Sequence, residues 1–496
     1  MRTVLSYLLI LFSFLIFSNS CTVQRSPVSG NKRAYAYTWE EEVQIGQSAD
    51  KEIVAQYGIY QDDNLSEYVD GISMDILQNS DMRREDTPEK YRETEFTFRV
   101  LDSPVVNAFA LPGGYVYVTR GLIAHLENEA QLSVVIGHEI AHVAARHASQ
   151  RGLTQTIGQI VAVGGAVLGQ ELLGLSGQNL LALSSQATQL MLLSYGRDDE
   201  RESDRLGVEY AAKTGYAAAE GGKFFTSLKR ISESSNQSLP TFLSSHPDPG
   251  EREQTIPQKA QQWEEEGYEQ TIYDAEEFMS YLDGIIYGNN PRNGFTEDEV
   301  FYHPDLEFQF PVPENWQVVN QAQQVALVSP EQNAVMIFQI DSEASNPEES
   351  VQNFLTSNEL QAESQQSTSS SGRWDAYVAT TTAQGEQQEL GVYLYAVEYG
   401  GNIYRFLNYS SADQYSNFEP HFEETTTEFD RLTNQQILNI NPVRLNVVQT
   451  DRRARFSDLL PNSLPMDIQP EEIAILNQVQ LDEMIEVGTT IKIPTQ

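Results

Sequence analysis

The chain of 496 residues contains a single cysteine, Cys21. A lone cysteine excludes an intrachain disulfide and a metal cluster built from cysteine thiolates. Basic residues are also scarce, because 31 Lys and Arg stand against 71 Asp and Glu, for a formal net charge of −40. This charge argues against nucleic acid as a partner, since phosphate binding needs a basic surface. A hydrophobic content of 40% is nevertheless enough for several folded domains.

The apolar run at residues 4–17 is too short to span a bilayer comfortably, and it follows Arg2. This arrangement is typical of a signal peptide, which we expect over residues 1–20. The segment "FSNSC" resembles a bacterial lipobox, although Ser18 stands where Leu is usual. We therefore predict a lipid anchor on Cys21 and a polar tether over 21–39, with plain secretion as the alternative. Thr22 after the cysteine, in place of Asp, favours the periplasmic side of the outer membrane.

Hydrophobic periodicity predicts an α+β protein with three folded units. The first, residues 40–285, is expected to be mainly helical with a small sheet. Its predicted elements are helices over 40–57 and 183–215, strands over 94–103 and 108–121, and a long helix capped by Asn128. The uncharged segment 152–170 is expected to be a packed or membrane-facing helical hairpin. After a linker near 285–297 we expect an α+β accessory domain over 298–435, with helices near 348–356 and 415–431, and a terminal module over 441–496.

His138, Glu139 and His142 form an HExxH motif in the predicted long helix. Residues four apart lie on one helical face, so both imidazoles can bind one metal ion. Glu139 lies to the side, where it can take a proton from a metal-activated water and return it to a leaving amine. The motif therefore predicts one tightly bound zinc ion per chain and hydrolysis of a peptide bond.

A catalytic zinc usually has three protein ligands and one open position. Glu200 and Asp204 lie four apart on a later helix, so Glu200 can bind zinc while Asp204 accepts the free N–H of a ligand histidine. Glu202 is a rival, but it is rotated off that face. Glu171 stands alone in the sequence and is the weaker candidate.

His147 lies five residues after His142, about 140° further round a continuous helix. We therefore expect its side chain to point away from the metal, as a group behind the ligands or at the surface.

The motif HExxH followed by ExxxD resembles the HtpX-, BepA- and LoiP-type zinc metalloproteases of peptidase family M48. The similarity covers about 24–260 and includes "NAFALPGGYVYVTRGL", "GHEIAHVAARH", "YGRDDERESDRLG" and "SSHPDPGER". Gly196 departs from the family pattern, which often has Ser there. The resemblance implies a gluzincin-type fold, zinc ligands His138, His142 and Glu200, and Glu139 as the catalytic base. It also implies substrates among misfolded or unassembled envelope proteins.

His246 stands in "FLSSHPDPGER", and the family resemblance implies that this element lies over the active site. Three roles are open for it. As a neutral imidazole, His246 can take the fourth zinc position and keep the enzyme inactive. Alternatively, His246 can stabilise the oxyanion of the intermediate, or it can merely order the loop.

The tail over 441–496 is similar to the end of a LysM-like module, and such modules often bind peptidoglycan. A purely structural module is the alternative. The 298–435 region resembles compact domains of the PsbP or Mog type. The leading expectation is a lipid-anchored zinc endopeptidase in the periplasm. The alternatives are a chaperone-like outer-membrane assembly factor with a latent protease site and a cell-wall-binding protein.

Overall fold

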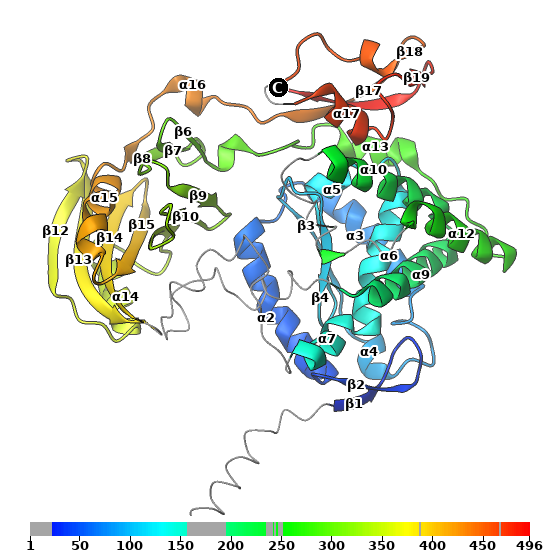
Figure 1. Cartoon of the computed structure of the whole chain (residues 1–496), viewed down its shortest axis with the longest axis horizontal. Helices are drawn as coiled ribbons and strands as arrows, with labels where there is room; N and C mark the ends of the chain where they lie inside the picture. Colours follow the sequence, from blue (N-terminus) through cyan, green and yellow to red (C-terminus); the bar gives the residue numbers. More distant parts are fainter. Residues whose placement is uncertain are drawn as a thin grey trace, which may run out of the picture.

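The computed structural model describes residues 22–155, 195–234, 242, 245–246, 251–385, 388–465 and 468–496. Over these ranges the chain mixes helices and sheets, as predicted, in a mainly helical body, a sheet domain beside it and a small module lying on the helical body (Figure 1). No helix in these ranges is long and apolar enough to cross a membrane. The predicted signal peptide, Cys21 and most of the predicted 152–170 hairpin lie outside the described residues.

The helical body contains a three-stranded sheet in the order β3-β5-β4, in which β3 is parallel and β4 antiparallel to β5. Its strands are β3 (Thr97–Leu101), β4 (Ala108–Leu111) and β5 (Tyr115–Thr119). Its helices are α2 (Trp39–Tyr57), α3 (Asp63–Gln78), α4 (Glu89–Arg92), α5 (Arg120–Ala124), α6 (Glu129–Ala145), α7 (His147–Gln155), α9 (Arg197–Thr214), α10 (Gly221–Ser234), α12 (Arg252–Glu265) and α13 (Ala275–Leu282). The strands predicted over 94–103 and 108–121 are therefore confirmed. Gly113 and Gly114 make the turn between β4 and β5 with φ of 83° and 104°, a region that favours glycine.

Helix α6 begins where the sequence predicts, because the Asn128 side chain accepts a hydrogen bond from the Gln131 amide. Every residue of α6 is buried. Helix α9 crosses α6 at two glycines, since a Cβ added to Gly207 would lie 2.6 Å from the His138 amide nitrogen. A Cβ on Gly137 would lie 2.7 Å from the Gly207 carbonyl oxygen. The two backbones are thus in direct contact, which brings the side chains of both helices to one point.

The amino-terminal segment forms a β-hairpin of β1 (Thr22–Arg25) and β2 (Lys32–Tyr35). The prediction of a tether is therefore wrong for residues 22–39, which form this hairpin and the start of α2. Arg146 donates to the Gln24 side chain at 2.9 Å, and the Tyr91 hydroxyl donates to the Arg25 carbonyl at 3.0 Å. Pro, Gly and polar residues are common in turns as well as in tethers, so composition alone did not separate the two.

The sheet domain is built on a seven-stranded antiparallel sheet in the order β12-β13-β14-β15-β11-β10-β9. Helices α14 (Pro347–Ser357) and α15 (Tyr415–Thr427) occur near the predicted positions and pack into separate apolar clusters. The strands of the large sheet are β9 (Gln317–Asn320), β10 (Gln324–Val328), β11 (Ala334–Ile340), β12 (Ser364–Ser370), β13 (Trp374–Gln384), β14 (Glu389–Tyr399) and β15 (Asn402–Ser411). A smaller sheet has β6 (Phe295–Glu297), β7 (Val300–His303), β8 (Phe308–Pro311) and β16 (Asp430–Arg431). Of the predicted linker, Ile285 and Ile286 are buried in the core of the helical body.

The terminal module contains β17 (Arg444–Gln449), β18 (Ala454–Arg455), α17 (Pro470–Leu476), β19 (Met484–Ile485) and β20 (Thr490–Thr495). Its fully buried Lys492 donates to the carbonyl oxygens of Ala124 and Leu126 at 2.9 and 2.8 Å and lies 2.8 Å from Glu127 Oε1. The ammonium thus has two carbonyl acceptors and one carboxylate oxygen within ion-pair distance. Because these groups lie at the last residue of α5 and in the segment between α5 and α6, the module directly contacts the chain that leads into α6.

Candidate metal centre

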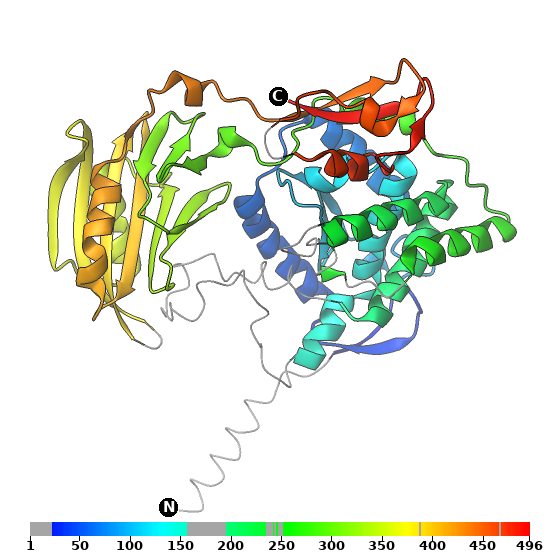
Figure 2. The same ribbon diagram turned by 45° about the horizontal axis from the view of Figure 1, so that its top comes forward.

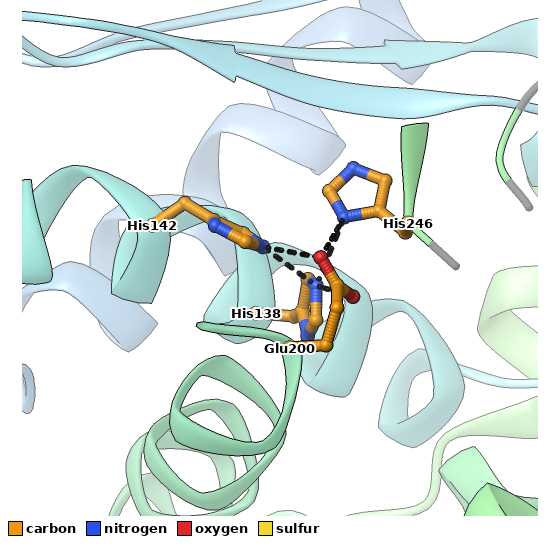
Figure 3. Close-up of side chains that lie close together, drawn as sticks. All are labelled: His138, His142, Glu200 and His246. Atoms are coloured by element: carbon orange, nitrogen blue, oxygen red, sulfur yellow. Dashed lines mark hydrogen bonds and ion pairs between the residues drawn. The ribbon is translucent and has the colours of Figure 1, made fainter. Parts of the chain in front are cut away.

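Three imidazoles and one carboxylate meet at a single buried point (Figure 3). His138 and His142 come from α6, Glu200 comes from α9, and His246 lies between α10 and α12. One ligand atom of each residue lies within 4.8 Å of all the others. The two Nε2 atoms of His138 and His142 are 3.0 Å apart, and His246 Nδ1 lies 3.2 Å from Glu200 Oε1.

This donor set fits a divalent metal ion. Imidazole nitrogens and a carboxylate oxygen are the usual ligands of catalytic zinc. All four side chains are buried, so water does not solvate their lone pairs there. Converging lone pairs in a buried space are unfavourable unless a cation or shared protons lie between them. The geometry therefore favours a metal ion at this point.

Glu139 lies beside this cluster and is fully buried. Neither of its carboxylate oxygens has a hydrogen-bond partner among the described residues, and Oε1 lies 3.6 Å from His246 Nε2. Burial raises the pKa of the Glu139 carboxyl. A carboxylate with free acceptors and a raised pKa is suited to taking up and releasing a proton.

A second layer of charges holds the cluster in place. His138 Nδ1 lies 3.0 Å from Asp204 Oδ1, which is the contact that the sequence predicts for Asp204. Arg252 donates to Asp204 Oδ2 at 2.9 Å and also contacts Glu200. Burial opposes ionisation of Asp204, but the Arg252 guanidinium holds its pKa below the usual value. Sequence reasoning missed Arg252, although it ends the quoted "SSHPDPGER" segment.

His147 lies behind His142 and outside the four-residue cluster. Helix α6 ends at Ala145 because Arg146 has a left-handed backbone with φ of 60°. The chain therefore turns, and His147 Nδ1 lies 3.0 Å from His142 Nδ1. Glu202 contacts His147 Nε2 at 3.3 Å rather than joining the cluster. The expectation of a group behind the ligands is confirmed, but the continuous helix assumed for it is wrong.

Two aromatic rings line the centre. Tyr195 stacks on His142 with ring centroids 4.0 Å apart, and Phe242 stacks on His246 at 4.8 Å. These rings restrict imidazole rotation and exclude water from one side of each ligand. Sequence reasoning did not select either residue. Glu171, the weaker candidate ligand, lies outside the described residues.

The residues of the cluster lie in a segment that matches a known protein family. The profile of peptidase family M48 matches residues 79–260, which contain all four residues of the cluster and Glu139. The chain contains a peptidase family M48 domain. Proteases of this family use a metal ion, typically zinc, and the cluster at His138 is consistent with such a site.

Two kinds of curated relative resemble the M48 domain. The beta-barrel assembly-enhancing protease of Escherichia coli K12 is 25% identical over 230 residues, which are 46% of this chain and 45% of that protein. The mitochondrial metalloendopeptidase OMA1 of Bos taurus is 32% identical over 168 residues, 32% of this chain and 31% of that protein. The alignments thus span less than half of these relatives. The solved structure of PsbP from Synechocystis sp. PCC 6803 aligns with 27% of this chain, and its TM-score of 0.23 is too low to support an argument.

Proposed function

We propose that the M48 domain is a zinc-dependent endopeptidase in which His138, His142 and Glu200 hold the metal. The observation that carries this proposal is the buried cluster of three imidazoles and one carboxylate beside Glu139, whose carboxylate has no hydrogen-bond partner among the described residues. Glu200 meets the cluster, whereas Glu202 contacts His147. This placement supports Glu200 over Glu202 as the third ligand.

The residues around the cluster divide the chemical work. When bound, zinc lowers the pKa of a coordinated water and polarises the peptide carbonyl. Glu139 takes up the proton of the attacking water and then delivers it to the leaving amine. Asp204 orients His138 through Nδ1, and His147 does the same for His142, so that both rings present Nε2 to the metal.

Substrate is proposed to bind along β4. This strand is one of the two edge strands of the three-stranded sheet, and it packs against α6, which carries the HExxH motif. An outer strand offers backbone hydrogen bonds to any extended polypeptide, whatever its side chains. Such recognition suits a protease that cuts unfolded proteins.

His246 is proposed to take the fourth metal position and to keep the enzyme latent. Its Nδ1 lies 3.3 Å from His138 Nε2 and 3.2 Å from Glu200 Oε1, within the ligand cluster. An oxyanion-stabilising role would instead leave His246 free to face substrate. This placement also favours the second candidate function, an outer-membrane assembly factor whose protease site is usually off.

The proposed location is the periplasmic side of the outer membrane, with a lipid anchor on Cys21. The proposed substrates are misfolded or unassembled envelope proteins. Relatives named beta-barrel assembly-enhancing proteases support this substrate class. Peptidoglycan is a further proposed partner of the terminal module, and only the LysM-like sequence pattern supports it.

The decisive experiment compares Glu139→Gln with the unaltered chain on an unfolded protein substrate. The variant should keep one zinc ion per chain and lose about 100- to 10,000-fold in cleavage rate, because an amide cannot take up the proton. Glu67→Gln, an exposed carboxylate on α3, is the matched control and should cut normally. Cleavage by Glu139→Gln at the native rate would refute the mechanism. In metal analysis, Glu200→Ala should lose zinc and Glu202→Ala should retain it, and the reverse result would reassign the third ligand.

A further inference from the structure

The β1–β2 hairpin presents a face that the metal site does not explain. Val23 pairs with Ala34 and Arg25 pairs with Lys32, so these four side chains share one face of the hairpin. All four are exposed, and Val23 is 62% exposed. We call this set, Val23, Arg25, Lys32 and Ala34, the hairpin face.

The charge of this face is opposite to that of the chain. Residues 22–38 contain three basic residues and no acidic one, in a protein of net charge −40. Arg25 and Lys32 stand directly opposite each other, and like charges in that position destabilise a strand pair. Neither residue forms an ion pair in the part of the chain that the structure describes; Arg33, on the other face, lies 3.8 Å from Glu202. An anionic partner would relieve this repulsion.

We infer that the hairpin face is a contact surface for anionic lipid headgroups. Paired cations suit phosphate groups, and the exposed Val23 can enter the region just below them. Tyr37, which follows β2 by two residues and is 42% exposed, is an amphipathic residue of the kind enriched at membrane interfaces. The hairpin also begins at Thr22, the residue after the predicted lipid site, so an anchor on Cys21 would bring this face to the membrane.

The hairpin face is preformed rather than ordered on contact. Arg84 donates to the Pro27 carbonyl at 3.1 Å, and the Ala36 amide donates to the Ser149 carbonyl at 3.1 Å. Together with the contacts of Gln24 and the Arg25 carbonyl, these bonds fix both strands on the helical body. Binding therefore need not order the hairpin. The terminal module lies at the opposite end of the helical body from the hairpin (Figures 1 and 2).

The test measures partition of the full chain into vesicles of phosphatidylcholine alone or with phosphatidylglycerol. Cys21→Ser is present in every arm, which removes the acyl anchor and makes the result independent of lipidation. Because partition is measured rather than cleavage, the result does not depend on protease activity either. Residues 4–17 are also common to all arms, so the ratio between the two vesicle types reports headgroup charge. The variant Arg25→Gln/Lys32→Gln should lower this ratio by about 30-fold, which corresponds to about 2 kcal/mol for two basic side chains near an anionic surface.

Arg452→Gln/Arg453→Gln is the matched control, because it removes the same charge from exposed arginines of the terminal module. It should leave the ratio nearly unchanged, and salt of about 1 M should abolish the preference of the unaltered hairpin. Lys32→Gln alone should give an intermediate ratio and guards against a folding defect in the double variant. Equal ratios for all variants, or equal losses in the hairpin and control variants, would overturn the inference.

Discussion

The contact between Gly137 and Gly207 makes the sharpest prediction about the metal centre. His138 and His142 lie on α6, while Glu200 and Asp204 lie on α9, so the crossing of these helices sets the distance between the ligands. We predict that Gly207→Ala separates the two helices and weakens metal binding without changing any ligand.

The size of the effect follows from the distances at the crossing. An alanine Cβ at Gly207 would lie 2.6 Å from the His138 amide nitrogen, whereas ordinary contact begins near 3.4 Å. The difference, 3.4 − 2.6, requires a local separation of about 0.8 Å, and the obstructing atoms are backbone. Functional sites tolerate displacements of only about 0.5 Å. Overpacking of this kind costs about 1–3 kcal/mol in stability, and we expect zinc affinity to fall about 10- to 100-fold, as when supporting residues are lost.

The assay is competition for zinc between the protein and a chromophoric chelator, together with thermal unfolding. Gly71→Ala is the control, because Gly71 is also inside a helix and a Cβ there meets nothing within 4 Å. It should keep native zinc affinity and gain up to about 1 kcal/mol in stability. Native zinc affinity in Gly207→Ala would show that this crossing does not set the ligand geometry.

Three further predictions concern His246, the terminal module and the buried His125. Under the latency proposal, His246→Ala should raise basal proteolysis, whereas lower activity at every pH with zinc still bound would sink that proposal. Lys492→Met should cost about 3 kcal/mol in unfolding free energy, because it leaves Glu127 and two carbonyls without their cation, while Arg453→Met, which breaks an exposed pair in the same module, should cost little. Burial lowers the pKa of His125 to about 4 in the folded protein, whereas the pKa in the unfolded chain is about 6.5. Between about pH 4 and pH 6.5, therefore, the unfolded chain binds more protons at this residue than the folded protein does. The protein should therefore lose up to about 3 kcal/mol as pH falls from about 6.5 to 4; in melting curves His125→Asn should flatten this dependence, and an unchanged slope would contradict it.

The parts of the site that the sequence predicts are those that depend on the spacing of residues within one helix. His138 and His142 share a helical face because they are four residues apart, and Glu200 and Asp204 share one for the same reason. In the structure His138, His142 and Glu200 meet at one cluster and Asp204 contacts His138, so the two pairs face each other where the helices cross. The crossing itself depends on Gly137 and Gly207, which no local pattern connects.

The parts that the sequence does not predict depend on distant contacts. The left-handed backbone of Arg146 places His147 behind His142, and this conformation is rare for a residue other than glycine. It is held by Glu42, which accepts from Arg146 Nε at 2.9 Å, and by Tyr35, whose ring lies 3.7 Å from the guanidinium. Tyr35 belongs to the hairpin, so the mistaken tether and the mistaken continuous helix share one cause.

The position of Lys492 gives assembly of the protease a time order. Lys492 is made 350 residues after His142 (492 − 142), yet it holds the chain that leads into the helix of His142. At about 5–20 residues per second, synthesis leaves an interval of roughly 20–70 s in which the metal motif exists and this contact does not. A chain in which Lys492 has not yet made these contacts should have a looser α6 and bind zinc more weakly. Fragments that stop before Lys492 would keep the whole HExxH motif but lack this contact. A newly made chain is therefore expected to reach full proteolytic activity only after the terminal module has folded onto the helical body.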